Sequence, residues 1–231
     1  MGFLYDSLVS AARLIADGDP ELLQIIRTTL AVCGASTFLG SVLGIPLGLV
    51  VAFGKFSGKR FVITVLNTLL ALPTVVVGLF VYAFLSRRGL LGGLDLLYTP
   101  EAIVIGQTIL VLPLAAALSL AAVSRIDPRF RQTALTLGAG PVRAAAAVAW
   151  EARFALAGAV AAVFGRVIAE VGVAMMLGGN VRGFTRVMTT AMALEYDKGR
   201  FSLAVALGMV LLALSFGVNL LMQLAQGKVR A

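Results

Sequence analysis

Residues 124–154 read SRIDPRFRQTALTLGAGPVRAAAAVAWEARF, a basic and polar stretch within an otherwise apolar chain. Asp127 and Pro128 supply a helix N-cap and a preset first turn, and Pro141 offers the same start to a second helix. Between them, Gly138-Ala139-Gly140 interrupts the helical pattern. The stretch therefore predicts two helices joined by a sharp bend, and we expect such a loop to be a docking surface.

The rest of the chain is too apolar for a soluble domain. Of its 231 residues, 60% are apolar and 13% are charged, which indicates an integral membrane protein. Five apolar segments each approach the ~20 residues that a helix needs to cross ~30 Å of hydrocarbon, and none shows the alternation of a barrel strand. We therefore expect an all-α membrane protein with five spans: Leu30–Phe53, Val62–Leu85, Ala102–Val123, Phe154–Leu177 and Leu203–Leu224.

The charges of the connecting segments predict the orientation. Residues 54–61, 124–153 and the tail from 225 carry ten Lys or Arg and two acids, whereas the segments on the other side carry eight Lys or Arg and eight acids. By the positive-inside rule the first side is cytoplasmic, so the N-terminus lies outside and the C-terminus inside. Because the basic residues lie in short loops next to the spans, they indicate the lipid bilayer rather than nucleic acid as partner.

The domain organisation is simple. Residues 1–19 have an apolar face typical of an interfacial amphipathic helix. Residues 20–231 form one transmembrane domain, in which residues 124–153 are a cytoplasmic loop. Proline at position 46 and at position 73 predicts kinks in the first and second spans, because proline removes a backbone hydrogen bond.

Two charges fall inside the fourth predicted span. Arg166 and Glu170 are four residues apart, so both project from one helix face, and each would be costly if it met lipid alone. One interpretation is a structural ion pair that fixes the rotation of the helix. The other is that the pair lines a transport pathway and takes part in its opening, and the two are compatible.

The segment after the fourth span predicts an outer mouth. Gly178-Gly179 permits a sudden change of direction, and residues 184–194 are apolar but too short to cross, as in a re-entrant or surface helix. Amides, hydroxyls and cations there favour anions, although the same groups could merely solvate the rim. The candidate residues are Asn180, Arg186, Thr189 and Thr190.

Catalytic signals are missing from the sequence. The chain has no histidine, a single cysteine, no Gly-Lys-Ser/Thr phosphate loop and no nucleophile with an evident base. We therefore expect no enzyme activity, no metal site and no cofactor bound by this chain. Energy for any transport would come from an ion gradient or from another subunit.

The central loop carries a resemblance to a known family. Residues 132–139, QTALTLGA, resemble the Glu-Ala-Ala…Gly loop of permease subunits of ATP-binding cassette (ABC) importers, with Gln132 and Thr133 in place of the usual Glu and first Ala. The resemblance implies the fold of the type I, MetI-like permeases and a loop that docks on a cytoplasmic ATPase subunit. The docking residues it implies are Gln132, Ala134, Leu137, Gly138 and Ala139.

A second resemblance narrows the family. Residues 165–180 are similar to a helix of molybdate, tungstate and sulfate permeases, and residues 179–195 are most similar to the tungstate type. This implies a pair of identical chains in a prokaryotic plasma membrane, cytoplasmic ATPases that use ATP, and an extracytoplasmic oxyanion-binding protein. A permease for sulfate, a secondary transporter or channel, and a non-transporting membrane scaffold stay open as alternatives.

Overall fold

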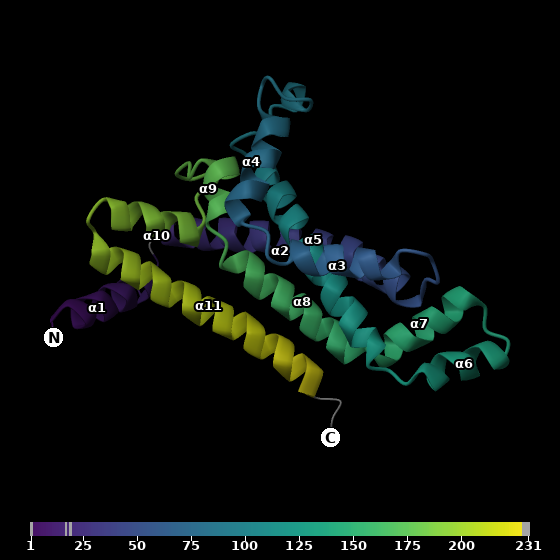
Figure 1. The fold of residues 1–231 in the computed structure, drawn as a ribbon. Helices are drawn as coiled ribbons and strands as arrows, with labels where there is room; N and C mark the ends of the chain where they lie inside the picture. Colours follow the sequence, from purple (N-terminus) through teal and green to yellow (C-terminus); the bar gives the residue numbers. More distant parts are fainter. Residues whose placement is uncertain (1, 17, 19, 228–231) are drawn as a thin grey trace. The chain divides into compact units, whose positions relative to one another are not determined.

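The computed structural model describes residues 2–16, 18 and 20–227, and this part of the chain is helical without a strand (Figure 1). Short connections join the helices. In order they are α1 (Gly2–Ala16), α2 (Pro20–Phe53), α3 (Lys59–Leu69), α4 (Thr74–Leu85), the 3-10 turn η1 (Gly92–Leu94), α5 (Pro100–Ser124), α6 (Pro128–Thr136), α7 (Pro141–Glu151), α8 (Arg153–Ile168), α9 (Gly172–Gly178), α10 (Met188–Asp197) and α11 (Phe201–Gly227).

The chain divides into two compact units, each with its own apolar core. The first unit comprises residues 1–36, 73–107 and 165–220, and the second comprises residues 37–72, 108–164 and 221–231. In the first unit, Met188 and Leu207 belong to one buried cluster and Ile103 to another. In the second, the buried clusters centre on Leu66 and on Val148.

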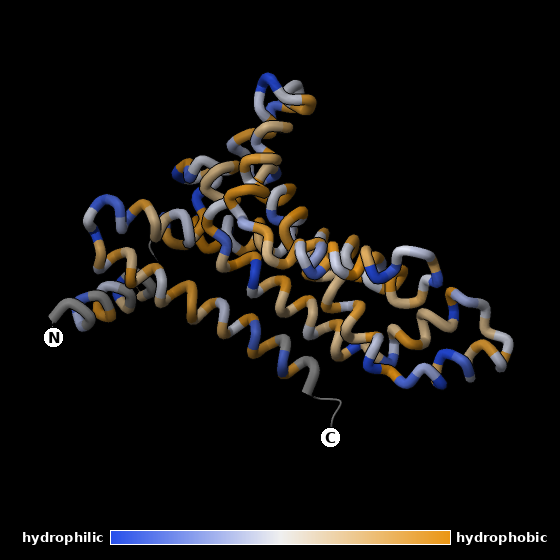
Figure 2. The backbone as a smooth tube through the Cα atoms, viewed as in Figure 1, coloured by the Kyte–Doolittle hydropathy of each residue, from blue (hydrophilic) through white to orange (hydrophobic). Residues whose placement is uncertain are grey.

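Three continuous helices, α2, α5 and α11, are long and apolar enough to cross a membrane. Figure 2 shows apolar residues along most of α11 and hydrophilic ones along much of α6. Two bent helix pairs, α3 with α4 and α7 with α8, raise the number of candidate spans in the described residues to five. α2 begins at Pro20, ten residues before the predicted first span, and is one helix of 34 residues. At 1.5 Å per residue it is longer than the ~30 Å of hydrocarbon.

The second predicted span is interrupted before its proline. Helix α3 ends at Leu69 and α4 begins at Thr74. The amides of Leu70, Ala71 and Leu72 donate to carbonyls three residues earlier, which tightens the end of α3 before Pro73. The predicted disturbance at Pro73 is therefore confirmed as a break, whereas α2 continues as a helix through Pro46.

The fourth predicted span is wrong as drawn. Helix α8 ends at Ile168 and α9 begins at Gly172, so residues 154–177 are not one helix. The hydroxyl of Thr189 donates to the carbonyl oxygen of Glu170 over 2.8 Å, a carbonyl that a continuous helix would use for its own backbone. At its other end α8 adjoins α7 with a bend of 71°.

Glycines let α2 and α5 approach closely within the second unit. A Cβ atom at Gly44 would lie 2.5 Å from the Cβ atom of Ala115, and one at Gly48 would lie 2.3 Å from the carbonyl oxygen of Ala116. Neither position has room for a methyl group. Gly44 and Gly48 thus allow a close contact between helix backbones of the kind that membrane helices use.

Helix α1 covers most of the segment predicted as an interfacial helix. Its side chains at Tyr5, Leu8 and Arg13 are exposed. Its location at a membrane surface and the boundary at residue 19 stay predictions. Asp19, the last residue of the predicted interfacial segment, and the basic residues Lys228 and Arg230 lie outside the described residues.

Candidate functional site

The hairpin, residues 124–153, has the helix-bend-helix shape expected from its sequence. The carboxylate of Asp127 accepts a hydrogen bond from the amide of Arg129 over 2.8 Å and so caps α6. Pro128 and Pro141 occupy the first positions of α6 and α7, where a missing N–H costs no helical hydrogen bond. The local signals for this loop are therefore confirmed.

A Schellman motif closes the bend. Gly138 has a φ of 87°, a left-handed conformation that strains any residue with a Cβ atom. Its amide donates to the carbonyl of Leu135 over 3.0 Å, and the amide of Ala139 donates to the carbonyl of Ala134 over 3.0 Å. Three of the predicted docking residues, Ala134, Gly138 and Ala139, thus hold the bend itself.

The tip of the hairpin exposes apolar side chains. Leu137 is 83% exposed and Val142 is 82% exposed, one on each side of the bend, and Trp150 on α7 is 71% exposed. Gln132 is exposed as well, whereas Ala134 and Ala139 are half-buried. Apolar side chains gathered on a polar loop are typical of a protein-protein contact.

Away from its tip, the hairpin is buried against the helices that precede and follow it. Val148 and Ala152 pack with Val123 at the end of α5, and Phe53 of α2 and Leu156 of α8 pack on this cluster. A displacement of the hairpin would therefore act directly on the ends of three long helices, because tightly packed side chains transmit strain.

The charged pair Arg166 and Glu170 meets across the end of a helix. Arg166 lies in the last turn of α8, and its Nη1 is 2.7 Å from Oε2 of Glu170. Glu170 lies beyond that helix, in the break, where it is 3% exposed. Its other oxygen accepts from the amide of Val173 over 3.2 Å, so Glu170 also satisfies an N–H of α9.

Two threonines that the sequence argument did not connect hold the start of α10. Thr189 donates to the Glu170 carbonyl, and the hydroxyl of Thr29 on α2 accepts from the amide of Met188 over 3.0 Å. Thr29 is 159 residues from Met188 in the chain, so no local pattern could have indicated this bond.

Three of the predicted outer-mouth residues, Asn180, Arg186 and Thr190, are joined by hydrogen bonds, and Thr189 bonds to Glu170 instead. Asn180, with a φ of 52°, donates to the carbonyl of Thr190 over 3.2 Å and accepts from Arg186 Nε over 3.3 Å. Thr190 is fully buried and Thr189 is 6% exposed. α10 begins at Met188, four residues after the predicted start. The structure thus gathers these side chains and commits both hydroxyls to internal partners, while a role in anion passage stays a prediction.

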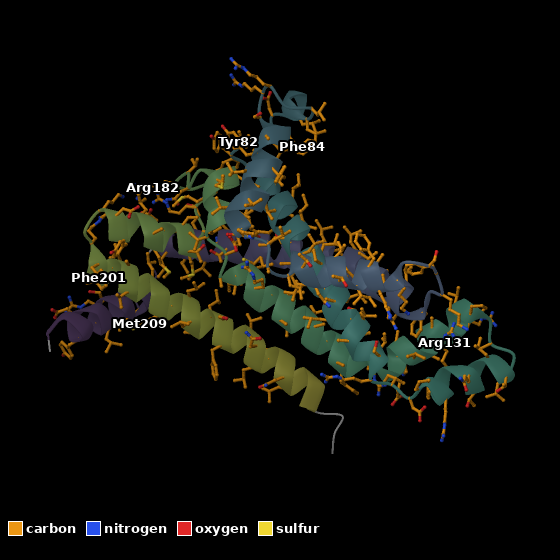
Figure 3. The ribbon with its side chains drawn as sticks, viewed as in Figure 1. Tyr82, Phe84, Arg131, Arg182, Phe201 and Met209 are labelled. Carbon is orange, nitrogen blue, oxygen red and sulfur yellow. The ribbon has the colours of Figure 1, made fainter. Side chains whose placement is uncertain are left out.

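Two carboxylates missed by the sequence argument organise the cations nearby. Glu21 is 3.0 Å from Arg186 and also pairs with Arg182, and Glu195 is 3.4 Å from Lys198 and 2.6 Å from Arg200. Only the spacing between Glu195 and Lys198 is a readable local signal. The six groups border a cavity of about 310 Å³, called here the Glu195 cavity, for which Figure 3 labels Arg182.

The remaining lining residues of the Glu195 cavity are apolar. Leu22, Ile25, Ala191, Leu203 and Leu207 complete the lining of the Glu195 cavity. The described residues contain no group of three or more His, Cys, Asp or Glu side chains that could hold a metal ion. The side chains around the Glu195 cavity interact through ion pairs, and the hairpin tip presents exposed apolar side chains.

The sequence matches a known protein family over most of its length. Residues 44–231 match the family described as "Binding-protein-dependent transport system inner membrane component". The chain belongs to this family of membrane-embedded transport subunits, the permeases of ABC importers. Its multi-pass, all-helical structure and its bent hairpin agree with that membership.

Individual relatives are similar over nearly their whole length. The chain is 42% identical to the "Probable anion ABC transporter permease protein" of Haloferax volcanii, covering 90% of this chain and 93% of the relative. It is 37% identical to the "Tungstate uptake system permease protein TupB" of Peptoclostridium acidaminophilum, covering 95% of this chain and 96% of the relative.

A solved structure shares the fold. A bacterial ABC transporter "involved in the import of the acidic polysaccharide alginate" superposes with a TM-score of 0.75 at 19% identity, covering 92% of this chain and 81% of that chain. The expected MetI-like importer-permease fold is thereby confirmed.

Proposed function

We propose that this chain is the permease subunit of an ABC importer that carries tungstate. The observation that carries the proposal is the 37% identity to a tungstate permease across 95% of this chain, joined to the hairpin with its exposed apolar tip. Molybdate and sulfate, which are also tetrahedral oxyanions, are the competing substrates. This chain supplies the pathway, and the partner ATPase subunit binds and uses ATP.

The proposed complex contains two copies of this chain, each forming half of the pathway, with two cytoplasmic ATPases and an extracytoplasmic oxyanion-binding protein. Leu137 and Val142 are exposed apolar side chains, which supports docking of the ATPase at this tip. The balance of basic residues supports a cytoplasmic hairpin, an outer N-terminus and an inner C-terminus.

The proposed mechanism is alternating access driven through the hairpin. ATP binding draws the ATPases together, and the hairpins move with them because the Schellman bend resists deformation. The buried cluster around Val148 carries this displacement to the ends of α2, α5 and α8. In the first unit, Arg166 and Glu170 set the geometry of the gate at the break between α8 and α9.

The outer end of the pathway is assigned to Asn180, Arg186, Thr189 and Thr190. Thr189 connects this group to the gate, because its hydroxyl holds the carbonyl of Glu170. Opening toward the binding protein would then require rearrangement of this hydrogen bond, which supplies a physical link between the outer group and the gate.

Uptake measured in cells that lack the chromosomal copy tests the substrate. Cells that express the chain with its ATPase and binding protein should accumulate tungstate, measured by mass spectrometry of the metal. An excess of molybdate or sulfate should compete poorly with this uptake. Preferential competition by sulfate would reassign the substrate. Proton-driven uptake by proteoliposomes that contain this chain without an ATPase would overturn the proposal in favour of a secondary transporter.

Labelling of single cysteines tests the orientation. In a Cys33→Ala background, Ser57→Cys and Arg88→Cys each place one thiol at an exposed position. A membrane-impermeant maleimide should label Arg88→Cys in intact cells. It should label Ser57→Cys only after the cells have been permeabilised. The reverse pattern would place the hairpin outside and remove the basis for ATPase coupling.

A further inference from the structure

A second cavity lies beside the hairpin in the second unit. It has a volume of about 510 Å³ and is called here the Arg131 cavity. The end of α2 and the connection to α3 form one wall, the end of α5 another, and α6 and α7 complete it. Its charged lining residues are Lys55, Lys59, Arg131 and Asp127, and Figure 3 labels Arg131.

The single carboxylate does not neutralise these cations. Asp127 already accepts the amide of Arg129 as the cap of α6. Lys59 donates to the carbonyls of Ala52 and Gly54, over 2.6 and 3.3 Å, and these acceptors carry no formal charge. Within the described residues, neither lysine nor Arg131 takes part in an ion pair.

Arg131 carries the strongest sign of a missing partner. Its guanidinium lies 5.5 Å from the centre of the Phe53 ring, a cation-π contact. Its Nε is buried and has no hydrogen-bond partner in the described residues. Buried polar groups are nearly always hydrogen-bonded, and an unpaired N–H of a cation calls for an acceptor, best an anionic one.

The remaining lining gives the ligand a mixed character. Phe53, Ile126, Leu135 and Val148 offer apolar surface, and Ser124 and Gln132 offer neutral polar groups. The volume is many times the ~30 Å³ share of one water molecule, so the cavity has room for more than a bare ion. Apolar walls beside clustered cations match a phosphate group that is attached to a lipid.

We propose that the Arg131 cavity binds a phosphate group, carried by the headgroup of an anionic phospholipid, between Lys55 and Arg131. Basic pockets at the cytoplasmic ends of membrane helices bind such headgroups. Bound there, the phosphate ties the end of α2 to α6 and so stiffens the hairpin against the helices it drives. The assignment to the cytoplasmic leaflet rests on the orientation given under the proposed function.

The test is lipid-dependent thermal unfolding of the purified full-length chain in detergent. Dioctanoyl phosphatidylglycerol is titrated against dioctanoyl phosphatidylcholine, with inorganic phosphate as a third arm. The variants are Lys55→Gln and Arg131→Gln. Arg143→Gln is the matched control, because Arg143 is an exposed hairpin residue that does not line the cavity.

Phosphatidylglycerol should raise the unfolding midpoint and phosphatidylcholine should not. Each cavity variant should weaken the phosphatidylglycerol titration about tenfold, and Arg143→Gln should leave it unchanged. An equal shift from inorganic phosphate, lost in the same two variants, would keep the phosphate site and overturn the lipid as its source.

Two other outcomes overturn the site altogether. One is an undiminished phosphatidylglycerol shift in both cavity variants, and the other is an equal loss in Arg143→Gln. Lys55 is exposed, so its variant gives a usable result even where Arg131→Gln fails to fold. The titration needs neither ATP nor tungstate, so its failure is distinct from a failure of the uptake assay.

Discussion

The Glu195 cavity and the Arg131 cavity have the same net charge but differ in whether their cations are paired with carboxylates. Four cations and two carboxylates line the first, and three cations and one carboxylate line the second, which leaves each with two positive charges in excess. In the first, each carboxylate pairs with two cations. In the second, the carboxylate caps a helix, and within the described residues none of the three cations takes part in an ion pair.

The contrast extends to the regions around the two cavities. The first unit keeps its buried acids, Glu170 and Glu195, in intramolecular ion pairs. The hairpin of the second unit has unpaired cations and an exposed apolar tip at Leu137 and Val142. Net charge alone therefore does not identify a binding surface, whereas unpaired cations and exposed apolar side chains indicate one. Substitutions in the first unit should change stability, whereas those in the hairpin should change partner binding.

The largest loss of stability is expected at Glu170. Glu170→Ala removes the partner of Arg166 and the acceptor for the Val173 amide, and should lower the free energy of unfolding by about 3 kcal/mol. Because Arg166 is partly exposed to solvent, the expected loss lies at the lower end of the range for breaking a buried ion pair. Thermal unfolding in detergent measures it, with exposed Glu101→Ala as control.

Transport assays on the same variant sharpen the comparison. Glu170→Ala should reduce tungstate uptake while the ATPase still copurifies, because the hairpin is unchanged. Loss of ATPase copurification would show that the first unit also determines docking, and would break the division between the two regions.

Glu195→Gln should have the next largest effect. It leaves Lys198 and Arg200 unpaired beside a buried amide, at a cost of about 2 kcal/mol, limited because both cations are roughly half exposed. Because the pairs are electrostatic, added salt should narrow the gap in unfolding midpoint between variant and wild type. Asp197→Asn, two residues away and exposed, is the matched control, and an equal loss there would remove the special standing of Glu195.

A smaller loss is expected at the bend. Gly138→Ala forces a Cβ atom into a left-handed conformation at a cost of about 1 kcal/mol, although open space surrounds the position. Uptake should fall far more than stability, because the docking geometry is disturbed. Gly140→Ala is the control: Gly140 has a φ of −64° and equally open surroundings, so it should transport normally.

The smallest effect on stability is expected at the tip. The double change Leu137→Ser with Val142→Ser should alter the free energy of unfolding of the isolated chain by less than about 0.5 kcal/mol, because both side chains are exposed. ATPase affinity should nevertheless fall by about tenfold or more, measured by titration of labelled ATPase. Unchanged affinity would contradict docking at this tip.

The hairpin was predictable because its signals are local. Asp127, Pro128, Gly138 and Pro141 each act through geometry within a few residues, and all four behave as their residue types require. The membrane class was predictable for a similar reason, since the length and apolarity of α2, α5 and α11 are properties of single segments.

The polar core of the first unit was not predictable from local patterns. The break after Ile168 lies in a segment that stays apolar up to Leu177. The carbonyl of Glu170 in this break accepts from Thr189, which comes 19 residues later. Arg186 was expected to face an anion, yet its carboxylate partner Glu21 lies 165 residues away in the chain. Contacts of such separation are set by tertiary packing rather than by sequence period.

The glycine contact between α2 and α5 has a mechanical consequence. At Gly44 and Gly48 the backbone of α2 lies directly against α5, so at these two positions no long, flexible side chain separates the helices. The two helices should therefore bend together there, with a higher bending stiffness than either helix alone. Within the second unit, a displacement of α2 near Gly48 should therefore move the adjacent turn of α5 with little local deformation.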